Sequence, residues 1–168
     1  MEETGLGTAF RNSQVNTIWE GTTNILALDV LRVLIKSKGS ALVTFANVLT
    51  KKLKTAVDIA PKELSNAADL IQKSLTTTCA FVSNTKDQVQ IETSIRQVTF
   101  ALGRVVAGVL LLEQAAWALK NNIIGAEQDV VVLNQWCQDP EFSAPIKALD
   151  ADILTQEAKM VFGPNAKL

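Results

Sequence analysis

The sequence predicts an all-α protein, an antiparallel four-helix bundle with additional C-terminal helices. Apolar residues recur at steps of three and four along most of the chain, which is the spacing of an amphipathic helix. No stretch alternates apolar and polar residues as a half-buried strand would. With 168 residues, 48% of them hydrophobic and 20% charged, the chain is long and apolar enough for one domain with a substantial core.

Three helices are predicted in the first half of the chain. The first begins after Thr22, Thr23 and Asn24, any of which can act as its N-cap, and it ends before Gly39. Its predicted apolar stripe consists of Ile25, Leu28, Leu31 and Ile35. A second helix is expected from Ser40, as its cap, to about residue 56, and a third from Pro61 to about residue 84.

The clearest helical pattern covers residues 89–121. Its apolar seam consists of Ile91, Ile95, Val98, Leu102, Val105, Val109, Leu112, Ala116 and Leu119. Glycine disfavours a helix interior by about 1 kcal/mol relative to alanine, so Gly103 and Gly108 suggest the close approach of a neighbouring helix. A short helix from about Glu127 to Cys137 and a last amphipathic segment over 146–154 complete the prediction.

Composition excludes several classes of function. The chain has no histidine, so a histidine base, a Ser-His triad and a histidine metal ligand are all impossible within it. Its two cysteines form no metal-binding or redox motif, and no metal is expected. The longest apolar run, 105–112, is short beside the roughly 20 residues of a membrane span, so no transmembrane segment is expected. The first residues show no targeting signal; an intracellular protein, mitochondrial or cytoplasmic, is expected, without a choice between the two.

One acidic residue, Glu20, stands between Trp19 and Gly21, directly before the first predicted helix. The dipole of a helix favours an acidic residue at this end, and this interpretation accounts for the spacing alone. The indole and the glycine add an apolar wall and an unobstructed backbone, which suit a general base that removes a proton from a carbon away from water.

The segment FRNSQVNTIWEGTTNILALDVLRVL, residues 10–34, resembles the C-terminal catalytic segment of the acyl-CoA dehydrogenase family. That pattern is Tyr-Arg-Asp, a short spacer, an aromatic-Glu-Gly-Thr/Ser block and Asn/Glu-Ile opening a helix. The most similar branch is that of the bacterial alkylation-response flavoprotein. The resemblance implies that the whole chain, 1–168, is the C-terminal helical domain of a larger flavoprotein, whose N-terminal helical domain and middle β-domain are not included.

The resemblance also implies roles for five residues. Glu20 falls where the family keeps the base that removes the α-proton of an acyl-CoA thioester. Gly21 falls where the backbone lies against the substrate. Thr22, Thr23 and Asn24 fall where the helix start meets FAD, in keeping with the preference of helix N-termini for anions.

Two residues depart from the family pattern. Phe10 stands where Tyr is usual and Asn12 where Asp is usual, although Arg11 matches. The resemblance implies an FAD-dependent oxidoreductase of fatty acid metabolism, with an acyl-CoA substrate, an electron-acceptor flavoprotein and a homo-oligomeric assembly. The chain by itself is expected to be inactive.

A helical binding or oligomerisation module is the alternative function. The long apolar seam would suit a module of this kind, although core packing accounts for it equally well. Association with DNA would rest on Lys51, Lys52 and Lys54, which are also ordinary for a solvated helix face. With a net charge of −1 the chain has no strong electrostatic footprint for nucleic acid, so DNA binding is not expected.

Overall fold

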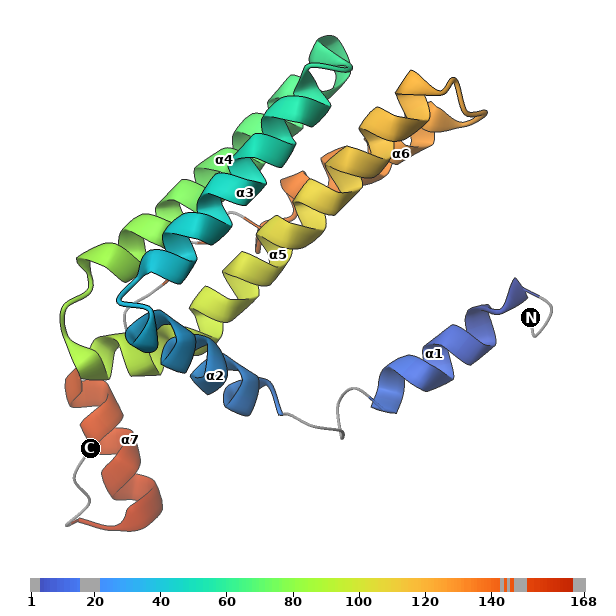
Figure 1. Ribbon diagram of the computed structural model, residues 1–168. Helices are drawn as coiled ribbons and strands as arrows, with labels where there is room; N and C mark the ends of the chain where they lie inside the picture. Colours follow the sequence, from blue (N-terminus) through green and yellow to red (C-terminus); the bar gives the residue numbers. More distant parts are fainter. Residues whose placement is uncertain (1–3, 16–21, 143, 145, 147–150, 165–168) are drawn as a thin grey trace.

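The computed structural model describes residues 4–15, 22–142, 144, 146 and 151–164, and all seven elements that it contains are α-helices (Figure 1). They are α1 (Leu6–Val15), α2 (Thr23–Lys36), α3 (Ser40–Val57), α4 (Pro61–Asn84), α5 (Gln88–Lys120), α6 (Ala126–Gln138) and α7 (Ala151–Phe162). No strand is found in these described ranges. The all-α class is therefore confirmed, whereas the antiparallel four-helix bundle is a finer statement and stays a prediction.

Helix α1 was not predicted from the sequence. It has no buried residue, and Leu6 and Phe10 are among its exposed apolar side chains. A helix that packs against nothing needs no continuous apolar stripe, and the sequence accordingly carries no strong periodic signal there. In Figure 1, α1 lies apart from the other helices.

Helix α5 is the centre of the packing, with contacts to α2, α3, α4 and α6. Its larger apolar cluster joins it to α3, α4 and α6. The largest fully buried side chains of this cluster are Leu64, Ile71, Leu75, Val105, Val109, Leu112 and Leu133. Burying each such side chain contributes roughly 1.5–3 kcal/mol, so this cluster supplies most of the driving force for folding.

A smaller apolar cluster joins α2 to the N-terminal half of α5. It consists of Ala27 and Leu31 from α2, and Ile95 and Val98 from α5. Phe81 and Val82 of α4 pack against this cluster as partly buried side chains, and α2 also contacts α3, so the orientation of α2 depends mainly on this stretch of α5. The start of α2, where the predicted site lies, is therefore positioned by α5.

The predicted seam of α5 is largely confirmed. Its buried members are Ile95, Val98, Val105, Val109, Leu112 and Ala116. Ile91, Leu102 and Leu119 are only half-buried. Leu102 packs against the smaller cluster. The apolar seam of α5 could be predicted from the sequence because other helices pack against α5 along most of its length.

The predicted stripe of α2 is mostly wrong. Of its four residues only Leu31 is buried, whereas Ile25, Leu28 and Ile35 are exposed. The face toward α5 instead runs through Ala27 and Leu31. The periodic method fails because α2 has apolar residues on several sides, so more than one apolar stripe can be drawn along it.

The turn between α2 and α3 confirms the predicted stop at Gly39 but not the predicted cap at Ser40. Gly39 has φ 83°, in the left-handed region that favours glycine, and its N–H donates to the Leu34 carbonyl at 3.0 Å. Gly39 is itself the N-cap residue of α3, and Ser40 is the first residue of that helix.

One described helix, α5, is long and apolar enough to cross a membrane by length and composition alone. The central helix of a folded core passes the same test, and α5 contacts four other helices of this chain. This single helix is weak evidence for a membrane span, and the expectation of no transmembrane segment is not contradicted.

The two glycines inside α5 differ in their surroundings. A Cβ atom on Gly108 would lie 3.1 Å from Ile71 Cγ1 and 3.4 Å from Phe142 Cε2, whereas a Cβ on Gly103 would meet no atom within 4 Å. The predicted close approach of a neighbouring helix is therefore confirmed at Gly108, against α4, and is wrong at Gly103.

Alanine at these two positions is expected to change stability in opposite directions. Gly103→Ala should raise the free energy of unfolding by about 0.5–1 kcal/mol, because it gains helix propensity without a clash. Gly108→Ala should lower it by about 1 kcal/mol, because its Cβ would lie 3.1 Å from the side chain of the fully buried Ile71, which would have to shift. Urea unfolding of the two variants beside the wild type measures both changes. Equal stabilisation by both would contradict the helix packing described here.

Candidate functional site at the start of α2

The structure describes three of the five predicted site residues. Glu20 and Gly21 lie outside the described residues. Thr22, Thr23 and Asn24 are described: Thr22 is the N-cap of α2 and the other two are its first residues. The site can therefore be built from the helix start onward.

The start of α2 presents backbone donors and polar side chains. The Thr22 carbonyl accepts from the N–H groups of Ile25 at 2.9 Å and Leu26 at 3.3 Å. The N–H groups of Thr23 and Asn24 come too early in the helix for a partner within it, and in the described structure the Thr22 side chain does not cap them. Thr22 and Asn24 are exposed and Thr23 is half-buried, so this end of the helix fits an anionic group.

Arg96 of α5 lies at this helix start. Its Nη1 donates to Asn24 Oδ1 at 3.3 Å, and its guanidinium carbon lies 5.6 Å from the centre of the Phe100 ring. Arg104 lies about two turns after Arg96 on α5. Its guanidinium carbon lies 5.7 Å from the centre of the same ring, and it forms an ion pair with Glu141. The sequence analysis missed Arg96, since no local motif links residues so far apart in the chain.

The basic cluster on α3 is an ordinary solvated helix face. Lys52 Nζ donates to both carboxylate oxygens of Glu113 on α5, at 2.6 and 2.8 Å. Lys51 and Lys54 are exposed. A partly exposed ion pair of this kind contributes about 0–1 kcal/mol, and it neutralises one of the three charges on which DNA binding would rest.

The described part of the chain contains neither a candidate metal-binding cluster nor a reactive cysteine thiolate. No group of three or more His, Cys, Asp or Glu side chains there could hold a metal ion. Burial raises the pKa of the Cys137 thiol from its ordinary 9.0 to about 11, and burial raises the pKa of the Cys79 thiol as well. Both thiols are therefore neutral at physiological pH and are poor nucleophiles.

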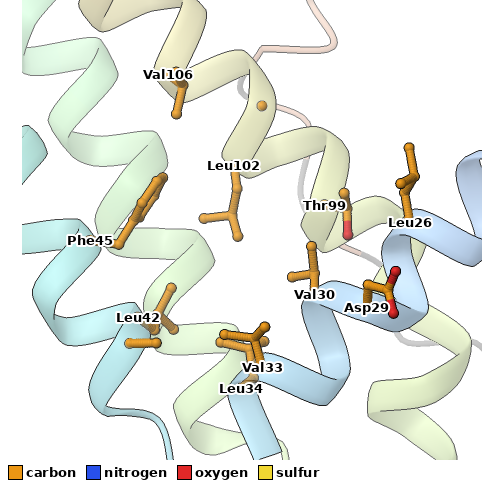
Figure 2. A pocket seen from close by; sticks show the side chains of 12 residues that line it. Leu26, Asp29, Val30, Val33, Leu34, Leu42, Phe45, Thr99, Leu102 and Val106 are labelled. Carbon is orange, nitrogen blue, oxygen red and sulfur yellow. The ribbon is translucent and has the colours of Figure 1, made fainter. Parts of the chain in front are cut away.

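An apolar groove of about 560 Å³ lies between α2, α3 and α5, close to the candidate site (Figure 2). Figure 2 shows Val30 and Val33 of α2, Phe45 of α3, and Leu102 and Val106 of α5 along its walls. Asp29 is the one charged side chain among the described residues that line it. The groove thus provides an apolar surface beside the polar helix start.

Comparison with known proteins defines the class to which this all-α chain belongs. A family model described as "Acyl-CoA dehydrogenase 11 C-terminal domain-like" matches residues 40–162, from α3 to the end of α7. The chain therefore belongs to this family of acyl-CoA dehydrogenase C-terminal domains. The family predicted from the sequence is confirmed.

The chain is also similar to two individual proteins that carry the name acyl-CoA dehydrogenase. "Acyl-CoA dehydrogenase family member 11" of Caenorhabditis elegans is 35% identical over 141 residues, which cover 82% of this chain and 22% of the relative. "Putative acyl-CoA dehydrogenase AidB" of Escherichia coli strain K12 is 55% identical over 38 residues, or 23% of this chain and 7% of that protein. The chain thus spans about a fifth of the worm relative. No solved structure matches it.

The reactivity of the two cysteines tests the predicted burial of their thiols. In the folded chain at pH 8, Cys137 is expected to resist iodoacetamide until the chain unfolds, whereas the half-buried Cys79 should react slowly. Mass spectrometry of the alkylated peptides measures both rates. Rapid alkylation of Cys137 in the folded chain would contradict its burial.

The same thiol also predicts a pH dependence of stability. Above pH 9.0 an unfolded Cys137 loses its proton, whereas the folded chain retains this proton up to about pH 11. The contribution of Cys137 is therefore fully present below pH 9.0 and is lost as the pH rises to about 11. Cys137→Ala should show a smaller fall in the free energy of unfolding over this range, measured by urea unfolding.

Proposed function

We propose that this chain is the C-terminal part of an FAD-dependent acyl-CoA dehydrogenase, in which Glu20 is the catalytic base. Family membership supports the class of enzyme. The observation that supports the site is the start of α2 at Thr23, whose N-cap residue, Thr22, directly follows the Glu20-Gly21 pair in the sequence and does not cap the first turn with its side chain. A base located just before a helix start is close to backbone donors that bind developing negative charge.

The proposed chemistry is the α,β-dehydrogenation of an acyl-CoA thioester. The Glu20 carboxylate removes the α-proton, and the Glu20 backbone N–H donates to the thioester carbonyl, where enolate charge develops. Gly21 lets the substrate approach the backbone without a side chain in the way. When bound, FAD supplies the acceptor for the β-hydride.

The residues at the start of α2 fit contact with FAD. Thr22, Thr23 and Asn24 combine hydroxyl and amide groups with the free N–H groups of a first helical turn, and the charge of Arg96 lies within hydrogen-bond distance of Asn24. This donor set suits the anionic part of a dinucleotide. The chain spans only about a fifth of its worm relative. We therefore assign the remaining features to the proposed whole enzyme: FAD, the acyl-CoA substrate, an acceptor flavoprotein and a homo-oligomeric assembly.

The finer architecture is part of the same proposal. Helices α2, α3, α4 and α5 would form the antiparallel four-helix bundle, with α6 and α7 as the additional C-terminal helices. Its support is that α5 contacts the other three, and that α3 contacts both α2 and α4. The chain by itself would neither retain FAD nor oxidise acyl-CoA, because the remaining walls of the site come from outside it.

A binding or oligomerisation module is the second candidate. The observation that favours it is the exposed apolar groove beside α2. It is compatible with the dehydrogenase proposal, because a domain of a large enzyme also needs surfaces for its neighbours.

Substitution of the proposed base tests the function directly. In the full-length protein, Glu20→Gln keeps the shape and the backbone N–H but removes the basicity. Flavin content and acyl-CoA affinity should persist, while the rate of flavin reduction by substrate should fall by roughly 10²- to 10⁴-fold. Rapid-mixing absorbance of the flavin measures this rate.

Glu63→Gln is the matched control, since Glu63 is an exposed glutamate in the first turn of α4 and undergoes the same chemical change. It should reduce its flavin at the wild-type rate. If the Glu20→Gln variant reduced its flavin at nearly the wild-type rate, Glu20 would not be the catalytic base and would be only an acidic residue before a helix.

A further inference from the structure

The first turn of α2 is joined to α5 by a polar contact as well as by apolar packing. Arg96 Nη1 donates to Asn24 Oδ1 at 3.3 Å, between residues that are 72 positions apart in the chain. Asn24 precedes Ala27 by three residues and Leu31 by seven, so it lies on the helix face that these two bury against α5. The hydrogen bond therefore fixes the exposed end of an otherwise buried face.

The Phe100 ring holds the Arg96 side chain in place. Arg96 precedes Phe100 by four residues and Arg104 follows it by four, so the three lie along one side of α5. The two guanidinium carbons lie 5.6 and 5.7 Å from the ring centre, within the roughly 6 Å over which a cation and an aromatic ring attract each other. Glu141 pairs with Arg104, whereas no carboxylate in the described part of the chain forms an ion pair with Arg96. The ring thus positions Arg96 beside Asn24.

The contact with Arg96 sets the orientation of the Asn24 amide. A guanidinium group can only donate hydrogen bonds, so the amide atom that faces it is the oxygen. The NH2 group of Asn24 then points away from Arg96, and because Asn24 is exposed this group can donate to a molecule at the helix start. Without Arg96 the amide could turn over, since the last torsion of asparagine has a broad, roughly two-fold preference.

An outward NH2 group on Asn24 matches the backbone donors of the same turn. The N–H groups of Thr23 and Asn24 have no partner within the helix, so side chain and backbone would donate in one place. Phosphate oxygens accept hydrogen bonds of this kind, whereas an outward amide oxygen would repel them. The orientation set by Arg96 therefore favours an anion at this helix start.

Arg96 belongs to a different part of the chain from the segment that it contacts. The family model covers residues 40–162 and includes Arg96, whereas Asn24 lies before that range, four residues after Glu20. The helical unit that this model describes therefore supplies a side chain to the helix start that follows the proposed base.

We propose that Arg96 is a positioning residue of the flavin site, which holds the Asn24 amide with its oxygen toward α5 so that the NH2 group donates to an anionic oxygen of FAD. The proposal rests on the proposed function, in which FAD contacts this helix start. It adds a residue of α5 to that site, and Arg96 acts there through Asn24. Lysine would be an incomplete replacement, because an ammonium group lacks the planar shape that stacks on Phe100.

A double-mutant cycle on the full-length protein tests this indirect action. FAD is removed, and the dissociation constant of added FAD is measured from the quenching of its fluorescence. Arg96→Met keeps a long side chain against Phe100 but removes every donor, so it should weaken FAD binding about ten-fold, and Asn24→Ala should do so by a similar factor. The double variant should bind FAD within about two-fold of Asn24→Ala, because Arg96 then has nothing to position.

Two matched variants separate positioning from a general effect of charge. Arg104→Met removes a guanidinium from the same ring without a bond to Asn24, so FAD affinity should stay at the wild-type value. Arg96→Lys keeps the charge and a donor, so it should weaken FAD binding only about three-fold. The flavin-free Arg96 variants should melt within about 2 °C of wild type, because Arg96 is exposed.

Three results would overturn the proposal. Wild-type FAD affinity in Arg96→Met would mean that this contact positions nothing. Losses that multiply in the double variant would mean that Arg96 acts on FAD without Asn24. An equal loss in Arg104→Met would assign the effect to charge alone. A full-length wild type that binds no FAD would contradict the proposed function together with this inference, whereas normal wild-type binding with no loss in Arg96→Met contradicts only the role of Arg96.

Discussion

Burial of the apolar faces of α5 is the constraint on which the rest of the fold depends. This helix contributes to both apolar clusters: Val105, Val109 and Leu112 pack with α3, α4 and α6, while Ile95 and Val98 pack with α2. Gly108 permits the close approach of Ile71 at the larger cluster. Since each large side chain contributes roughly 1.5–3 kcal/mol, removal of this one helix would leave neither cluster with a core.

The candidate site inherits its position from this packing. Helix α2 is fixed by Ala27 and Leu31 against α5, and the short turn at Gly39 joins it to α3. The polar helix start and the apolar groove are therefore two parts of one element. One end of α2 presents Thr22 and Asn24 beside Arg96, and its side presents the apolar wall. The family model begins only after this helix, at residue 40.

How well the sequence predicted each element depended on the partners that the element has within this chain. The seam of α5 could be predicted because partners cover it along most of its length, and only its ends and Leu102 are less buried than expected. The stripe of α2 could not, because apolar residues occur on several sides of this helix and most of them are exposed. Helix α1 gave no signal, having no buried residue. At the site, a local motif supplied Thr22, Thr23 and Asn24, whereas Arg96 required the fold to bring it to Asn24.

A structure of the full-length protein with FAD and an acyl-CoA analogue tests the central claim most directly. The account predicts the Glu20 carboxylate at roughly 3–3.5 Å from the α-carbon of the analogue, with the first turn of α2 against FAD. A start of α2 that faces solvent, with the acyl group held elsewhere, would contradict the proposed role of this domain in catalysis.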